Sequence, residues 1–83
     1  MAPQKTFHLT IARVDGPLFE GDVSSVTVPG VEGEMTLLAE HSAIVSPLKA
    51  GVVTVRAEGG EQFFEVEESG TLEVSGNQAT VLM

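Results

Sequence analysis

The sequence predicts an all-β domain, either an antiparallel β-sandwich or a flattened barrel of eight to ten short strands. Runs rich in β-branched residues recur at short spacing, and no stretch keeps a convincing helical period. Glycine-containing turn signals separate these runs, as in sheets whose strands are joined by hairpins. The chain has 83 residues, which predicts one domain (residues 1–83) with a small core.

Three extended segments are predicted before the first glycine loop. Residues 7–11 alternate apolar and polar side chains, so their apolar members share one face. A turn at residues 15–17 precedes a second segment at residues 18–23. Residues 23–28 are rich in valine, serine and threonine, as strands are, and the Pro-Gly pair at residues 29–30 ends them.

The second half of the chain is predicted to form a strand, a loop and two hairpins. Residues 35–44 could pass for a helix, but they are few and lie between turn signals, so strand followed by loop is favoured. The first hairpin joins residues 52–56 to 62–66 through 58–61, and the second joins 71–74 to 78–82 through Gly76-Asn77.

The composition excludes several classes of partner. Twelve acidic residues against four basic ones give a formal charge of −8, which disfavours nucleic acid and anionic lipid as ligands. The same charge fits a basic protein partner, or solubility alone. The chain has no cysteine for a disulfide framework, and its sequence shows neither a secretory signal nor an apolar stretch of transmembrane length. A cytoplasmic protein without direct membrane insertion is expected.

No residue pattern predicts catalysis, a metal or a cofactor. The chain lacks cysteine and tyrosine, and its two histidines are His8, in a predicted strand, and His41, in a predicted loop. Neither has the neighbours that a metal site needs. The glycines at 30 and 33 are not a phosphate loop, because no lysine and no helix follow them. We therefore expect a protein that is not an enzyme.

Glu32 and Glu34 lie in the glycine loop at residues 30–34 and have two interpretations. Acidic residues in a turn are most often simply solvated. Two carboxylates on a tight loop can instead accept charge-assisted hydrogen bonds from arginine on a partner. The residues alone favour the first interpretation.

The run from Phe19 to Val53 keeps one ordered pattern of strand, turn and loop residues. Its members are Phe19, Gly21, Val23, Val26, Val28, Pro29, Gly30, Gly33, Leu38, His41, Leu48, Lys49 and Gly51. In this pattern the run resembles the N-terminal β-sandwich domain of the epsilon subunit of F-type ATP synthases, called delta in mitochondria. The likeness extends to the closing segments at residues 70–74 and 79–82. Ala39-Glu40 departs from the pattern, because a Pro-Gly turn is usual there.

The resemblance implies an antiparallel β-sandwich of about ten strands and a non-catalytic subunit of the central stalk, or rotor. Such a subunit binds gamma and the membrane c-ring, couples proton or sodium translocation to ATP synthesis, and is peripheral to the energy-transducing membrane through the complex. It implies that Glu40, His41 and Ser42 contact gamma. It further implies a c-ring contact made by Gly30, Val31, Glu32, Gly33 and Glu34.

Further expectations, and one alternative function, complete the interpretation. The sequence ends where many members continue into a helical hairpin, so neither inhibition of ATP hydrolysis nor ATP binding is expected. Phe63 and Phe64 are adjacent in a strand, so one should face the core and the other should be a candidate contact for gamma. The alternative function is a free-standing acidic β-sandwich adaptor. A carbohydrate-binding module is disfavoured, because no tryptophan or tyrosine is present to stack on sugars.

Overall fold

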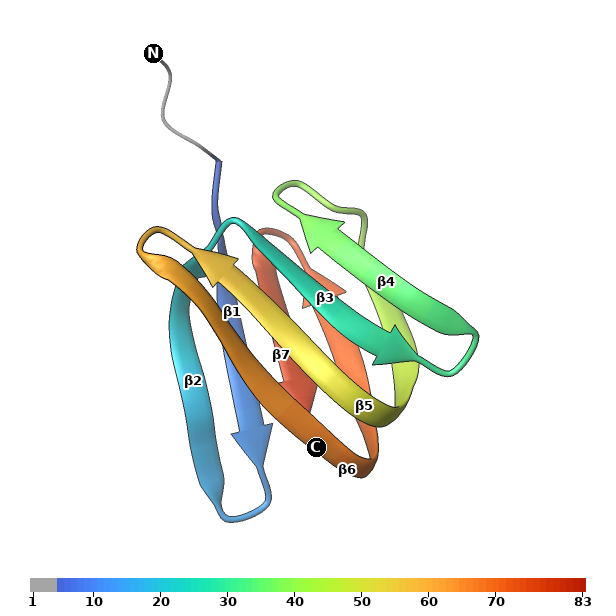
Figure 1. Ribbon diagram of the computed structural model, residues 1–83. Helices are drawn as coiled ribbons and strands as arrows, with labels where there is room; N and C mark the ends of the chain where they lie inside the picture. Colours follow the sequence, from blue (N-terminus) through green and yellow to red (C-terminus); the bar gives the residue numbers. More distant parts are fainter. Residues whose placement is uncertain (1–4) are drawn as a thin grey trace.

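The computed structural model describes residues 5–83, which form seven strands and no helix (Figure 1). The strands are β1 (Phe7–Arg13), β2 (Gly16–Val23), β3 (Ser25–Gly30), β4 (Gly33–Leu38), β5 (Ile44–Ala57), β6 (Gly60–Ser75) and β7 (Gln78–Leu82). Turns separate β5 from β6 and β6 from β7 where they were predicted. The turn between β1 and β2 lies at residues 14–15, slightly before the expected residues 15–17, because β2 already begins at Gly16. The ambiguous segment after Gly33 is strand followed by loop, as expected.

The seven strands form one sheet in the order β2-β1-β7-β6-β5-β3-β4. Neighbours are antiparallel except β1 and β7, which run parallel with His8 opposite Gln78. The expected antiparallel sheet is therefore mixed at this one pair. Hairpins join β1 to β2, β3 to β4, β5 to β6 and β6 to β7, and a hairpin requires antiparallel strands. The pairing of the first strand with the last is non-local and has no local signal.

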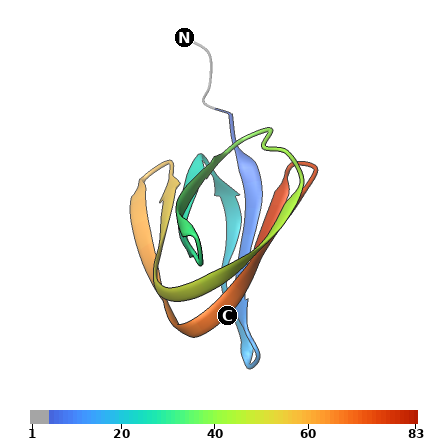
Figure 2. The same ribbon diagram turned by 90° about the vertical axis from the view of Figure 1, so that its right-hand side faces the viewer.

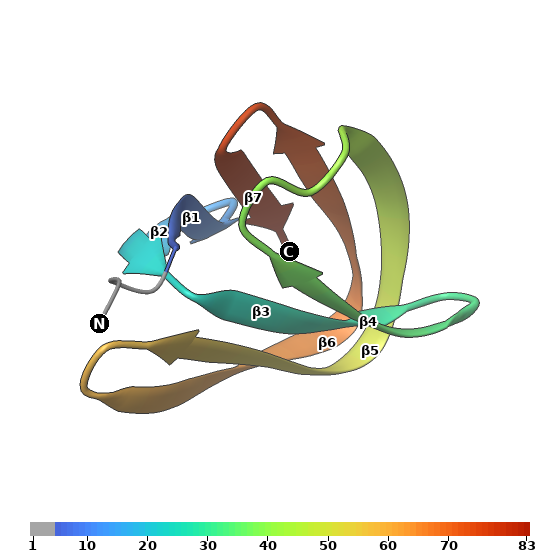
Figure 3. The same cartoon turned by 90° about the horizontal axis from the view of Figure 1, so that it is seen from above.

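Two long strands bend the sheet into two layers. β5 and β6 pair along nearly their whole length, and their register shifts between Lys49 and Gly51. Figure 2 shows the arms of this hairpin diverging from the bend, and Figure 3 shows them crossing from one layer into the other. The β-sandwich is thus confirmed, but with seven strands instead of about ten, because β5 and β6 continue through the bend. Gly51 sits there because a Cβ atom would lie 2.8 Å from Cβ of Pro29.

The core lies between the two layers and consists almost wholly of aliphatic side chains. The alternation predicted for residues 7–11 is confirmed, since Phe7, Leu9 and Ile11 are all buried. Phe64 is half-buried and its ring centroid lies 5.9 Å from that of Phe19, while Phe63 is exposed, as the strand alternation required. The remaining core residues are Val23, Val26, Val28, Leu37, Leu48, Val53, Val55, Val66, Leu72, Val74, Ala79 and Val81.

Candidate functional site

The loop at residues 30–34 is the tip of the β3–β4 hairpin, which projects from the side of the sandwich (Figure 1). Gly30 and Gly33 are paired in the register, so Val31 and Glu32 form a two-residue turn. Gly33 has a φ of 137°, which glycine adopts without strain. The Val31 N–H donates to the Pro47 carbonyl at 3.2 Å and so fixes the hairpin against β5.

Both carboxylates of this loop are exposed and available to a partner. Within residues 5–83, neither Glu32 nor Glu34 has an ion-pair partner. A cavity of about 180 Å³ lies beside them. Its lining also includes Met35, Ser46 and Pro47, which the sequence did not assign to this site. Ser46 and Pro47 reach it through the pairing of β3 with β5, which is not evident from the sequence.

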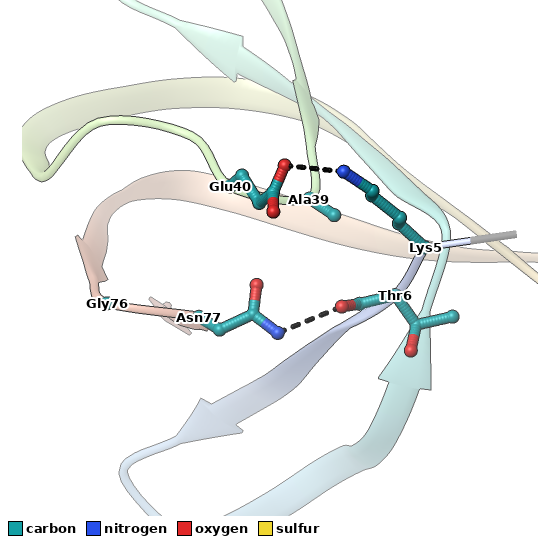
Figure 4. Close-up of a pocket in the computed structure, with 6 residues that line it drawn as sticks. All are labelled: Lys5, Thr6, Ala39, Glu40, Gly76 and Asn77. Atoms are coloured by element: carbon teal, nitrogen blue, oxygen red, sulfur yellow. Dashed lines mark hydrogen bonds and ion pairs between the residues drawn. The ribbon is translucent and has the colours of Figure 1, made fainter.

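The second predicted contact, Glu40-His41-Ser42, lies in the loop between β4 and β5. Glu40 has a φ of 67°, a left-handed conformation that glycine adopts easily and glutamate rarely does. Its carboxylate accepts a hydrogen bond from the Lys5 ammonium at 2.9 Å (Figure 4). His41 makes a hydrogen bond between its Nδ1 and the Ser42 carbonyl at 2.8 Å. Glutamate thus keeps the backbone conformation that suits the glycine of a Pro-Gly turn.

A cavity of about 440 Å³ separates this loop from the β6–β7 turn. Figure 4 shows Lys5 and Thr6 on one side, facing Glu40 and the Gly76-Asn77 turn. The Asn77 side-chain amide donates to the Thr6 carbonyl at 2.9 Å, which anchors the turn to the approach to β1. Sequence reasoning missed Lys5, Thr6 and Asn77. The pairing of β1 with β7 brings Thr6 to Asn77, and the closure of the two layers brings Lys5 to Glu40.

The two predicted contacts do not form one site. They lie at opposite ends of β4, whose six residues separate them by about 20 Å at the usual strand rise. A protein that touches both loops must therefore extend along β4, or two different partners must bind them.

A histidine cluster that the sequence did not reveal lies on the outer face of β1 and β2. His8 lies 3.1 Å from Glu20 (Nε2 to Oε2) and 3.5 Å from Asp22 (Nδ1 to Oδ1). The hydrogen bond to Glu20, reinforced by Asp22, raises the pKa of His8, although partial desolvation opposes the shift. The cluster arises from the β1–β2 register, in which His8 is opposite Asp22.

Among residues 5–83, no group of three or more histidine, cysteine, aspartate or glutamate side chains is placed to hold a metal ion. The described part of the chain also contains no helix long and apolar enough to cross a membrane.

The family model for the "ATP synthase, Delta/Epsilon chain, beta-sandwich domain" matches residues 6–83, nearly the whole chain. The chain belongs to this family. It is 42% identical over 78 residues to the ATP synthase epsilon chain of Nitratiruptor sp., covering 94% of this chain and 60% of the relative. It is 39% identical over 77 residues to ATP synthase epsilon chain 1 of Methylococcus capsulatus, covering 93% and 55%. The chain thus spans little more than half the length of these relatives.

Two solved structures share the fold of this delta/epsilon chain β-sandwich. One is a chain of the Euglena gracilis mitochondrial ATP synthase, determined as OSCP/F1/c-ring, with a TM-score of 0.86 and 28% identity; the match covers 98% of this chain and 51% of that one. The other belongs to the central stalk/c-ring of the Tetrahymena thermophila mitochondrial ATP synthase, with a TM-score of 0.78, 15% identity and coverage of 98% and 65%. At 15% identity the second match supports the fold alone.

Proposed function

We propose that this chain is a non-catalytic subunit of the central stalk of an F-type ATP synthase, where it binds gamma and the c-ring. Such a subunit helps to couple proton or sodium translocation to ATP synthesis, and it lies at the membrane surface through the complex. The observation that carries the proposal is the family match over residues 6–83. The likeness to a chain of an ATP synthase whose structure includes the c-ring supports it.

The β3–β4 hairpin is the proposed contact with the c-ring. Its tip projects from the sandwich, and its carboxylates at Glu32 and Glu34 have no ion-pair partner in residues 5–83. The hydrogen bond from Val31 to Pro47 keeps the tip in place, so little conformational entropy is lost on binding. Arginine on a polar loop of the ring is the expected partner, since guanidinium groups bind carboxylates through paired hydrogen bonds.

The loop at the other end of β4, with Glu40, His41 and Ser42, is the proposed contact with gamma. Because about 20 Å separates the two loops, gamma and the ring can contact the subunit at the same time. This arrangement suits a subunit that connects the two.

The first experiment measures association with purified gamma and purified c-ring from the same organism at low and moderate salt. Stoichiometric binding to gamma, with the negative heat-capacity change of apolar burial, supports the stalk role. A folded chain that binds neither would contradict it and would favour the adaptor function.

A pair of charge reversals then tests the hairpin. Glu34→Arg should weaken binding to the c-ring by about 1–3 kcal/mol if the contact is desolvated. Glu58→Arg is the control, because Glu58 is an exposed glutamate in the turn between β5 and β6. Equal ring affinity of the two variants at low salt would show that the hairpin is not the contact.

A further inference from the structure

One outer face of the sandwich is nearly free of charge, although the chain carries a formal charge of −8. This face is formed by β4, β3 and the adjoining halves of β5 and β6. Thr36, Thr27, Thr54 and Phe63 follow one another across the four strands in the register. Thr27 and Thr36 are joined by a hydrogen bond of 2.9 Å between their hydroxyls. We call the surface made by Thr27, Thr36, Leu38, Val52, Thr54 and Phe63 the threonine face.

The threonine face exposes three large apolar side chains. Phe63 is 63% exposed, Leu38 61% and Val52 49%. The outer face of the other layer differs, because it carries the acidic Glu20 and Asp22 around His8. An uncharged sheet surface with exposed aromatic and aliphatic side chains is typical of the centre of a protein interface.

Charges border the threonine face on two sides. On one side Arg56 makes an ion pair with Glu61, so their charges offset each other. On the other side Glu34 projects from β4 and Glu65, opposite Val52, from β6. These two carboxylates are three strands apart, about 14 Å at the usual strand spacing, and neither has an ion-pair partner in residues 5–83.

Electrostatic repulsion disfavours a second copy of this chain as the partner of the threonine face. In a symmetric dimer with the two-fold axis along the strands, Glu34 would oppose Glu65 of the second copy. With the axis along the row of threonines, Glu65 would oppose Glu61 of the second copy, whose charge Arg56 already offsets. The first arrangement brings unpaired carboxylates together, and each monomer carries a charge of −8, so repulsion opposes self-association.

We infer that the threonine face binds a different folded protein, whose surface has an uncharged centre and basic side chains opposite Glu34 and Glu65. Glu34 belongs both to this border and to the β3–β4 hairpin, so the face continues directly from the proposed c-ring contact. The partner therefore lies beside whatever the hairpin binds. This inference rests on the proposed function, because the partner is sought within the same complex.

Photo-crosslinking in the assembled ATP synthase tests the inference. A benzophenone amino acid replaces Phe63 in one variant and Val45 in the other, and the complex is purified from the source organism. Val45 is the matched control, since it is 70% exposed and lies on β5 outside the threonine face. We expect position 63, and not position 45, to crosslink to another subunit, at a peptide that contains lysine or arginine.

The other crosslinking outcomes separate the two proposals. If both variants co-purify with the complex but position 63 crosslinks to nothing, or only to a second copy, the inference is wrong and the stalk role stands. If neither variant co-purifies with the complex, the stalk role fails and this inference fails with it.

A second measurement uses two pairs of substitutions. It compares the affinity of each variant for ATP synthase from which this subunit has been removed. Phe63→Glu should lower the affinity at least tenfold, whereas Val45→Glu should not change it. Glu65→Lys should weaken binding most at low salt, while Glu73→Lys, opposite Val45 on β6, should have no such effect. All these side chains are exposed, so the variants should fold, which circular dichroism checks. Equal affinities within each pair would overturn the inference.

Discussion

Lys5 and Glu40 are 35 residues apart in sequence, yet the Lys5 ammonium lies 2.9 Å from the Glu40 carboxylate and links the approach to β1 with the β4–β5 loop. The same glutamate is the one described non-glycine residue with a positive φ. Both side chains of the pair are about 70% exposed, so the ion pair contributes at most about 1 kcal/mol. The left-handed backbone at Glu40 costs about as much.

Two substitutions at Glu40 separate these effects. Glu40→Ala removes the ion pair and keeps a Cβ atom at a φ of 67°, whereas Glu40→Gly removes both. Glycine should therefore be more stable than alanine at this position by about 1 kcal/mol. Urea unfolding of both variants measures the difference. An alanine variant as stable as the glycine variant would show that the loop relaxes out of the left-handed conformation.

His8 should make stability depend on pH near neutrality. Its pKa is raised above 6.5, first by the hydrogen bond to Glu20 and then by Asp22. The stabilisation is therefore fully present below pH 6.5 and is lost as the pH rises through the folded-state pKa. Between about pH 5.5 and pH 8.5, the wild type should lose more stability than His8→Gln.

Urea unfolding at both pH values tests this, with Glu20→Gln as a further control because it removes the main cause of the shift. Identical pH profiles for the wild type and His8→Gln would show that the cluster does not stabilise the imidazolium.

Leu37 and Leu38 are neighbours in β4 but face opposite sides, with exposures of 2% and 61%. Leu37→Ala should lower the free energy of unfolding by about 2–5 kcal/mol, because it leaves a cavity in the core. Leu38→Ala should change it by less than about 0.5 kcal/mol. Denaturant titration of the two variants measures both effects, and the reverse order would mean that β4 is shifted by one residue.

Gly70 lies where β6 passes close to the end of β7. An added Cβ atom would be 2.6 Å from the Leu82 carbonyl oxygen, so backbone would have to move. Gly70→Ala should destabilise the fold by about 1–3 kcal/mol. Gly21→Ala is the matched control, since its Cβ atom would meet only the Phe19 ring at 3.6 Å. Thermal unfolding compares them, and equal melting temperatures would contradict the close approach.

Local patterns predicted much of the fold. The alternation at residues 7–11 identified the buried face of β1, and glycine turns located the β5–β6 and β6–β7 hairpins. These features depend on neighbours in sequence, which the pattern of residues records directly. The glycine loop at residues 30–34 was located for the same reason, but the pairing of the strands on either side of it was not predicted.

Non-local pairing accounts for what the sequence did not reveal. The contact of His8 with Glu20 depends on the exact register of β1 and β2. The contact of Lys5 with Glu40 depends on how the two layers of the sandwich close. An exposed phenylalanine at residue 63 or 64 was expected, but the threonine face around it was not, because Thr27, Thr36 and Thr54 come from three strands and form a row only after pairing. The contacts assigned to gamma and the c-ring remain predictions.

The parallel pairing of β1 with β7 determines when this protein can finish folding during its synthesis. His8 pairs with Gln78, so the pairing of β1 with β7 can begin only after 70 more residues have been translated. At 5–20 residues per second that wait is about 4–14 s. Throughout it, Leu9 and Ile11 lack the neighbours on β7 that later cover them. The apolar face of β1 on the nascent chain is therefore incompletely covered for seconds, the interval in which exposed apolar surface favours aggregation.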